Sequence, residues 1–385
     1  MTATKSNDIV RKAVEASIRD HGEIGVQVCA YKDGRKIADV AMGVADVETG
    51  RMVDTGTLFN IWSISKAVIA TALHIQADRG LVEYDAPVAR YWPEFAANGK
   101  EGITVRHVLM HRSGAPQMPE GSTPERICDW EWVVRGLAAV KPLAAPGERP
   151  LYQAMSFGWL VGEIVRRTDP KHRQINAFVQ EEINRPLGID DLWIGVPRDR
   201  LARIARMIDE FPQQPEDKMP PIFAAAMPYK VRLKAEVFED DMIRTSQIPG
   251  VGGIATAGSV ARLFAMLAGG GALDGVRLLS ADRVAKFNTP RIGADEADGV
   301  MFGDVMPLST SGYWLGNDAH VGTHGFGGPR TFGHPGVGGT IAWADPDRNL
   351  SAAICHNRLR YARSAAEDPL LPIANAVREA WAAAD

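Results

Sequence analysis

Apolar positions recur with a helical period at both ends of the chain and with a strand-like period just inside each end. Residues 8–20 place their apolar side chains on one helical face. From Val26 to Met42 the period becomes two, and Asp33-Gly34 in the middle is typical of a hairpin turn. A strand–turn–strand unit directly after a helix favours an antiparallel sheet over a repeated βαβ arrangement.

The C-terminal part of the chain mirrors this arrangement. Three strand-like runs cover residues 330–334, 339–343 and 350–355, and a helical pattern follows at 369–384. Residues 81–194 between the two ends are mostly helical in pattern. We therefore expect an α/β fold of the α+β type, in which both termini build one central antiparallel sheet flanked by helices and a mostly helical domain is inserted. The expected domains are an α/β domain at 1–80 and 195–385 and a helical domain at 81–194.

Residues 199–247 carry no clear period. Five prolines, at 212, 215, 220, 221 and 228, exclude long regular elements there. An irregular stretch of this length in a compact domain is often functional, so we expect an extended excursion around the site, as a rim or a lid.

Composition narrows the class of protein. The chain has 385 residues and a formal net charge of −4, which gives no reason to expect nucleic acid or an anionic membrane as a partner. No run approaches the roughly 20 apolar residues that a membrane helix needs. The N-terminal residues are polar and lack the apolar centre of a secretory signal. The three cysteines, an odd number without a Cys-x-x-Cys pair, are expected to be reduced thiols. Reduced thiols are typical of the cytoplasm, so we expect a cytoplasmic protein. The sequence does not determine its oligomeric state.

The strongest candidate for chemistry is a Ser-x-x-Lys sequence, Ser63 to Lys66, followed by an apolar run that reads as a buried helix. If the helix starts near Ser63, the hydroxyl and the ammonium lie one turn apart on the same face. Serine needs a neighbouring base, and a lysine can act as one if burial lowers its pKa. This four-residue pattern often occurs by chance. Whether it indicates a catalytic site therefore depends on the other motifs in the chain.

Other short motifs are weaker. Residues 250–255 satisfy G-x-G-x-x-A, but no clear strand precedes them and a parallel sheet is not expected, so dinucleotide binding is disfavoured. The pairs His107/His111 and His320/His324 lack the carboxylate of a zinc motif, and we expect structural roles and no metal. The chain has no G-x-S-x-G elbow, so the common α/β-hydrolase arrangement is not supported.

Taken together and in order, several stretches resemble the serine β-lactamase and penicillin-binding protein superfamily, and most of all its family VIII carboxylesterases, which are similar to class C β-lactamases. The resemblance implies a serine β-lactamase-like fold with the active site in the cleft between the two domains. The matching stretches cover residues 59–66, 103–106, 111–114, 146–147, 152–162, 186–188, 252–253 and 332–339.

The resemblance also implies the site residues. Ser63 would be the nucleophile, Lys66 and Tyr152 would share the removal of its proton, and the backbone N–H groups of Ser63 and Val337 would form the oxyanion hole. A neighbouring ammonium would have to lower the pKa of Tyr152 for it to act as a phenolate. Substrate-binding positions would include Trp62, next to the nucleophile, and Gly336. No metal or organic cofactor is implied.

Two departures from the superfamily pattern bear on the substrate. The family's Tyr-x-Asn reads Tyr152-Gln153-Ala154 here, so Ala154 lacks the amide that holds a substrate amide. His334-Pro335-Gly336 replaces Lys-Thr-Gly. Both changes favour a small-molecule ester over a β-lactam or peptide. We expect a serine hydrolase for short-chain carboxylic esters, with β-lactamase, D-amino-acid amidase or peptidase, and acyltransferase as alternatives on the same fold. A non-catalytic ligand-binding protein is the remaining alternative.

Overall fold

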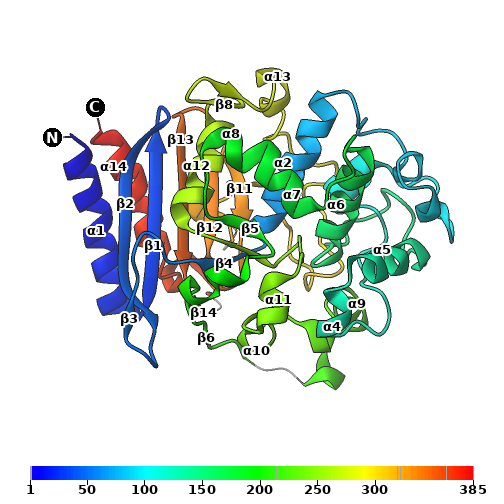
Figure 1. Cartoon of the computed structure of the whole chain (residues 1–385), viewed down its shortest axis with the longest axis horizontal. Coiled ribbons are helices and arrows are strands. Elements are labelled where there is room, and N and C mark those ends of the chain that lie inside the picture. The colour runs from blue at the N-terminus through cyan, green and yellow to red at the C-terminus, as the bar shows by residue number, and fades with distance from the viewer. Residues whose placement is uncertain (1, 213–214, 319, 321, 361, 385) are drawn as a thin grey trace.

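The structure is a computed structural model that describes residues 2–212, 215–318, 320, 322–360 and 362–384. Within that part of the chain the main feature is a seven-stranded sheet in the order β10-β11-β12-β13-β1-β2-β3, with antiparallel pairing throughout (Figure 1). Its strands are β1 (Gly25–Lys32), β2 (Arg35–Asp46), β3 (Arg51–Met52), β10 (Trp314–Leu315), β11 (Phe332–Pro335), β12 (Ile341–Asp345) and β13 (Leu350–His356).

The two ends of the chain meet in the middle of this sheet. Strand β1 pairs with β13 in a register that sets Val28 opposite Ile354. Helices α1 (Thr2–His21) and α14 (Leu371–Ala382) pack together beside one face, and α12 (Ala257–Ala268) packs on β1, β12 and β13. Neighbouring side chains of β1 accordingly enter different apolar cores, Val28 with the terminal helices and Cys29 with α12. The predicted fold class is confirmed, although α1 starts earlier than the apolar period indicated, because residues 2–7 carry no apolar repeat.

The middle of the chain is mainly helical, as the sequence predicted. Helix α2 (Ile64–Asp78) is buried from Ile64 to Ala77 and packs against α6 and β11, which is why apolar residues occur on every side of it. The other helices of this part are α3 (Val105–Leu109), α4 (Pro124–Ile127), α5 (Trp130–Ala139), α6 (Ser156–Thr168), α7 (Ile175–Val179), which runs into a π-helical turn at Gln180–Asn184, and α8 (Arg185–Leu187).

A second, three-stranded sheet was not predicted. It has the order β4-β7-β5, with β4 (Phe59–Trp62), β5 (Leu192–Ile194) and β7 (Gly253–Ala255). Strands of three or four residues are too short to show a period of two, so the sequence pattern could not reveal them. This small sheet matters for function because β4 leads directly into Ser63.

The stretch 199–247 contains only short elements, as its prolines indicated, and no helix or strand among its described residues exceeds six residues. Phe238 from this stretch packs against Trp62, with ring centroids 5.0 Å apart, so the excursion reaches the residue before Ser63.

The remaining α-helices and strands of the chain are α9 (Pro221–Ala226), α10 (Ala235–Phe238), α11 (Asp241–Thr245), α13 (Ala281–Val284), β6 (Ile208–Asp209), β8 (Ala272–Leu273), β9 (Val276–Arg277) and β14 (Arg358–Leu359).

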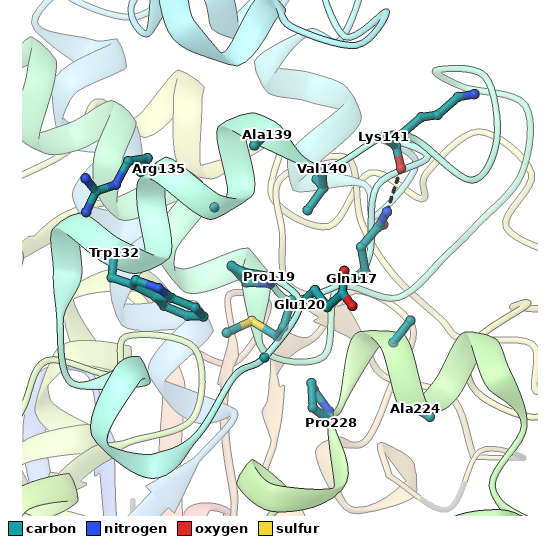
Figure 2. Close-up of a pocket in the computed structure, with 14 residues that line it drawn as sticks. Gln117, Pro119, Glu120, Trp132, Arg135, Ala139, Val140, Lys141, Ala224 and Pro228 are labelled. Carbon is teal, nitrogen blue, oxygen red and sulfur yellow. Dashed lines mark hydrogen bonds between the residues drawn. The ribbon is translucent and has the colours of Figure 1, made fainter.

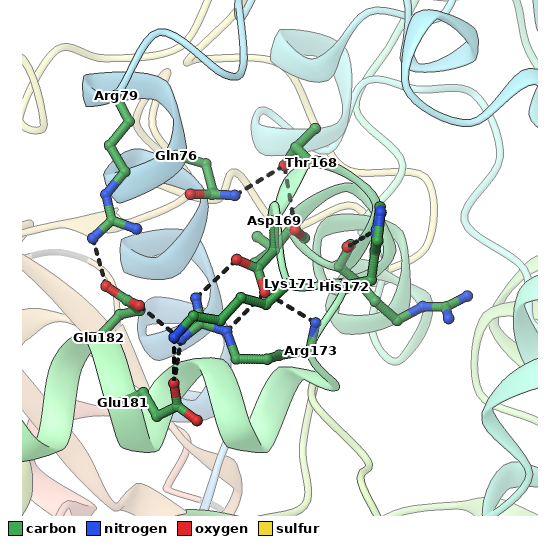
Figure 3. A network of polar contacts seen from close by, with 11 residues as sticks. Gln76, Arg79, Thr168, Asp169, Lys171, His172, Arg173, Glu181 and Glu182 are labelled. Carbon is green, nitrogen blue, oxygen red and sulfur yellow. Dashed lines mark hydrogen bonds and ion pairs between the residues drawn. The ribbon is translucent and has the colours of Figure 1, made fainter.

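A polar network around Arg173 joins the end of α2 to residues 169–182, which follow α6 (Figure 3). The Arg173 guanidinium donates two hydrogen bonds to Asp169, both 2.8 Å long, and one of 2.7 Å to each of Glu181 and Glu182. Glu182 also accepts from Arg79, which follows α2. Asp169 is only 1% exposed, so its carboxylate depends on Arg173 for its main charged partner.

Arg173→Met is therefore expected to lower the free energy of unfolding by roughly 2–4 kcal/mol, because it leaves a buried carboxylate without its cation. Lys171→Met is the matched control, since that ammonium is largely exposed and its pair with Glu181 spans 3.3 Å. The control should cost less than about 1 kcal/mol. Urea denaturation measures both, and equal losses in the two variants would contradict a structural role for the Arg173 network.

Candidate active site

Ser63 lies at a strained turn between β4 and α2. It is the N-cap residue of α2, and Trp62 before it has a φ of +48°, in the left-handed region that a residue with a bulky side chain rarely adopts. Ser65 helps to hold this turn: its hydroxyl donates to the Trp62 carbonyl and accepts a 2.9 Å hydrogen bond from the Gly253 N–H. Strain of this kind is typical of functional sites, where surrounding contacts impose it.

Lys66 is fully buried and its Nζ lies 2.9 Å from the Ser63 Oγ. The same nitrogen lies 2.9 Å from the carbonyl oxygen of Gly250. Burial lowers the pKa of Lys66 to about 7, because desolvation disfavours the ammonium. A substantial fraction of Lys66 is therefore a free amine near neutral pH, within reach of the Ser63 proton.

The carbonyl that holds Lys66 belongs to the glycine-rich stretch 250–255. A side chain at Gly158 would lie 2.1 Å from the Gly250 nitrogen, so α6 approaches this loop as closely as it does only because residue 158 is glycine. The stretch that satisfies a dinucleotide-binding pattern thus contributes to the lysine environment instead.

Tyr152 is buried beside this pair, with the Lys66 Nζ 5.5 Å from the centroid of its ring. Burial raises the pKa of Tyr152, while its neighbours Ser63 and Trp314 lower it to a smaller extent. The direction is opposite to the one expected for a phenolate. The physical reason is that burial disfavours the charged form of both groups, so that neutral lysine faces neutral phenol.

Of the two residues expected to form the oxyanion hole, Ser63 lies between β4 and α2, and Val337 lies shortly after β11, next to the predicted substrate-binding residue Gly336. Gly336 packs against β4: a side chain there would lie 3.2 Å from the Trp62 Cβ and 3.0 Å from the Ile61 carbonyl oxygen. Val337 follows at the start of a short 3-10 turn, Val337–Gly339. In the described part of the chain, the backbone N–H groups of Ser63 and Val337 donate to no other backbone group. Neither amide is therefore committed to a backbone carbonyl there, and their role as the oxyanion hole stays a prediction.

The other predicted binding residues are close-packed. His334 is fully buried; its Nδ1 donates to the Pro335 carbonyl at 2.7 Å, so the unprotonated Nε2 has no partner among the described residues. Burial and the nearby Lys66 hold the pKa of His334 well below its usual value. Ala154 and Trp62 are also buried. A role of these three residues in substrate binding stays a prediction.

The rate of ester hydrolysis is expected to be proportional to the fraction of Lys66 that is a free amine. Turnover should therefore rise as the pH passes upward through about 7. The sign follows from the shift: below that pH Lys66 is an ammonium and cannot accept the Ser63 proton. Because burial raises the pKa of Tyr152 away from this range, the measured midpoint is expected to report mainly on Lys66. A pH profile of kcat/KM on a neutral ester tests this, and a maximum near pH 5 would point to a carboxylate base instead.

Three residues around the site were not identified from the sequence. They are Gly250, which accepts from Lys66, His111, whose ring lies 4.4 Å from that of Tyr152, and Asp298, whose carboxylate accepts the Tyr152 N–H at 3.1 Å. His111 stands in one of the stretches that carry the family resemblance. Sequence spacing gave no sign that Gly250 or Asp298 approaches the site.

Among the described residues no group of three or more histidine, cysteine, aspartate or glutamate side chains could hold a metal ion. No helix in the described ranges is long and apolar enough to cross a membrane. An open groove lies between α5, the loop at residues 117–121 and the segment around α9, with Trp132 and Pro228 among its lining residues (Figure 2). Its lining residues include neither Ser63 nor Tyr152. We therefore locate the candidate active site by the Ser63, Lys66 and Tyr152 side chains and not by this groove.

Comparisons with known proteins show the family of the chain. The beta-lactamase family profile matches residues 10–374. The chain is 32% identical over 353 residues to "Esterase/beta-lactamase LipL" of Mycobacterium tuberculosis (strain ATCC 25618 / H37Rv), covering 87% of this chain and 77% of that protein. A family VIII carboxylesterase structure matches with a TM-score of 0.88 and 30% identity, over 97% of both chains. A penicillin-binding protein homologue from Caulobacter crescentus matches with a TM-score of 0.84 and 31% identity, over 98% of this chain and 97% of that one. The chain belongs to the beta-lactamase family.

Proposed function

We propose that the protein is a serine carboxylesterase that cleaves short-chain carboxylic esters through an acyl-enzyme on Ser63. The observation that carries this proposal is the 2.9 Å contact between the Ser63 hydroxyl and a buried Lys66 whose pKa is lowered to about 7. The similarity to a protein named an esterase/beta-lactamase and to a family VIII carboxylesterase structure supports the same activity.

In the proposed acylation, the free amine of Lys66 takes the Ser63 proton as Oγ attacks the ester carbonyl. The N–H groups of Ser63 and Val337 stabilise the oxyanion that forms. Tyr152, kept as a neutral phenol by burial, donates its proton to the departing alkoxide, and the Lys66 ammonium returns a proton to the phenol. The sequence predicted that Lys66 and Tyr152 share the removal of the Ser63 proton, and the pKa shifts of the two groups favour the lysine as the base and the tyrosine as the acid.

In deacylation, water takes the place of the alcohol and the same groups act in reverse. Tyr152 takes a proton from the attacking water as it passes its own proton to the free amine of Lys66, and the resulting ammonium returns a proton to Ser63 as the carboxylic acid leaves. Every proton moves between residues of the chain and the reactants, so the scheme requires no organic cofactor.

We also propose that the site lies in a cleft between an α/β domain (1–80 and 195–385) and a helical domain (81–194). The origin of the catalytic groups supports this: Ser63 and Lys66 belong to the first and Tyr152 to the second. The free thiols of Cys29, Cys128 and Cys355 favour a reducing compartment, and we propose a cytoplasmic location. The proposed partner is a small-molecule ester.

The main alternative, β-lactam hydrolysis, requires groups that this site lacks. Ala154 offers no amide, and His334 is held neutral where the superfamily pattern has a charged lysine. The two lost contacts are worth roughly 2–4 kcal/mol to a β-lactam. A small neutral ester needs neither contact.

We therefore expect kcat/KM for a butyrate ester to exceed that for any penicillin or cephalosporin by at least about 10²-fold. A panel of acyl esters, the matching amides and β-lactams, assayed with one enzyme preparation, tests the proposed function. Nitrophenyl butyrate should also give a burst of nitrophenol equal to the enzyme concentration if deacylation is the slower step. A protein that opens a cephalosporin as fast as it cleaves the butyrate would refute the assignment.

A further inference from the structure

The backbone that carries Tyr152 is held at three consecutive N–H groups. The Leu151 N–H donates to the His111 carbonyl at 2.9 Å. The Tyr152 N–H donates to the Asp298 carboxylate at 3.1 Å, and the Gln153 N–H donates to His111 Nδ1 at 3.0 Å. His111 therefore accepts on both sides of the tyrosine, once through its backbone and once through its ring.

The His111 ring also contacts the Tyr152 side chain. The two ring centroids lie 4.4 Å apart with their planes inclined by 31°, and Phe157 lies on His111 at 4.8 Å. His111 is fully buried, and its φ of +55° places it in the left-handed region. A histidine in this unusual conformation, packed between two rings, is fixed in one orientation by its surroundings.

The hydrogen bond from Gln153 also fixes the protonation of His111. Because Nδ1 accepts, the ring must be the neutral tautomer with its proton on Nε2. Burial holds the pKa of His111 well below its usual value, and the neighbouring Lys66, Arg291 and His334 act in the same direction. The ring thus remains an acceptor throughout the pH range in which Lys66 changes charge.

We propose that His111 is a positioning residue for Tyr152: its Nδ1 acceptor and its ring hold the phenol where it can donate a proton to the leaving alkoxide. This inference rests on the proposed ester hydrolysis and adds to it a residue that touches neither substrate nor nucleophile. It also accounts for the His107/His111 pair, in which only His111 reaches the site. His107 instead accepts the Thr104 N–H at 3.2 Å and caps α3.

The proposal has a consequence that general damage to the fold would not have. A misplaced acid harms the expulsion of a poor leaving group, such as ethoxide, far more than that of nitrophenolate, which leaves without a proton. Ethyl butyrate and nitrophenyl butyrate form the same acyl-enzyme. The ratio of their kcat/KM values, which includes only the steps through acylation, therefore reports on leaving-group protonation.

The decisive pair of variants is His111→Phe and His111→Asn. Phenylalanine keeps a ring in place but removes the acceptor, whereas asparagine keeps an acceptor at the δ1 position and tolerates the left-handed backbone. We expect His111→Phe to lower kcat/KM by roughly 10²-fold for ethyl butyrate and by less than about tenfold for nitrophenyl butyrate. His111→Asn should recover at least about tenfold of the ethyl ester loss.

His107→Ala is the matched control, and any loss in its kcat/KM should be the same factor for the two esters. Thermal melting checks the folding of each variant, and His111→Leu, which also lacks the acceptor, replaces the phenylalanine variant if that protein does not fold. Equal losses on the two esters, or an asparagine variant no better than the phenylalanine one, would overturn the proposal. If the wild-type protein hydrolyses neither ester, the proposed function fails instead, so the two failures are distinguishable.

Discussion

Ser63→Ala is expected to reduce ester turnover by about 10⁴-fold or more, because it removes the only atom that forms the acyl bond. Deleting one hydroxyl at a position 8% exposed should leave the fold intact. Residual activity would then come from the oxyanion hole and substrate binding acting on a water molecule. Turnover of nitrophenyl butyrate by the variant and the wild type, compared at equal folded concentration, gives the ratio directly.

A covalent label identifies the nucleophile independently of rate. A phosphonate ester should add one phosphonyl group to the wild-type protein, on the peptide that contains Ser63, and none to Ser63→Ala. Ser65→Ala is the matched control, two residues away and fully buried, where the hydroxyl holds the Trp62 turn. That variant should lose stability but still be labelled at Ser63. An adduct on any other residue would refute the assignment.

Removing the proton-handling groups is expected to have the second largest effect. Lys66→Met should lower kcat by roughly 10³-fold and Tyr152→Phe by roughly 10²-fold, the usual worth of a positioned base or acid. The double variant should lose little more than Lys66→Met alone, because both residues act on one proton circuit and their effects are not additive. Steady-state kinetics of the four proteins gives this double-mutant cycle.

Lys100→Met is the matched control for Lys66→Met, because it also replaces a buried lysine with a neutral side chain. Lys100 is also fully buried, but its ammonium donates to three backbone carbonyls, those of Ala97, Ala138 and Val140. Its replacement should destabilise the protein without altering kcat. If the Lys66 and Tyr152 double variant instead lost the full product of the single effects, the two residues would act in separate steps and the shared circuit would be wrong.

Much of the fold was accessible from local patterns. A helical period, a hairpin turn at Asp33-Gly34 and three apolar runs near the C-terminus were enough to predict a sheet built from both ends, since each is a property of neighbouring residues. The same holds for Ser63 and Lys66, which lie one helical turn apart and so meet once α2 forms.

The sequence by itself therefore determined most strands of the large sheet, the helical middle of the chain, the family and the identity of the candidate nucleophile and base, but not the three-stranded sheet that leads into Ser63. The tertiary structure decided the protonation state of the catalytic candidates. The pKa of Lys66 falls to about 7, and that of Tyr152 rises, because distant segments enclose both groups and remove water from them. The Gly250 carbonyl, the His111 Nδ1 and the Asp298 carboxylate reach the site from positions 184, 42 and 146 residues away from their hydrogen-bond partners. A contact between positions so far apart leaves no periodic signal in the chain, because only the packing of the whole fold brings them together.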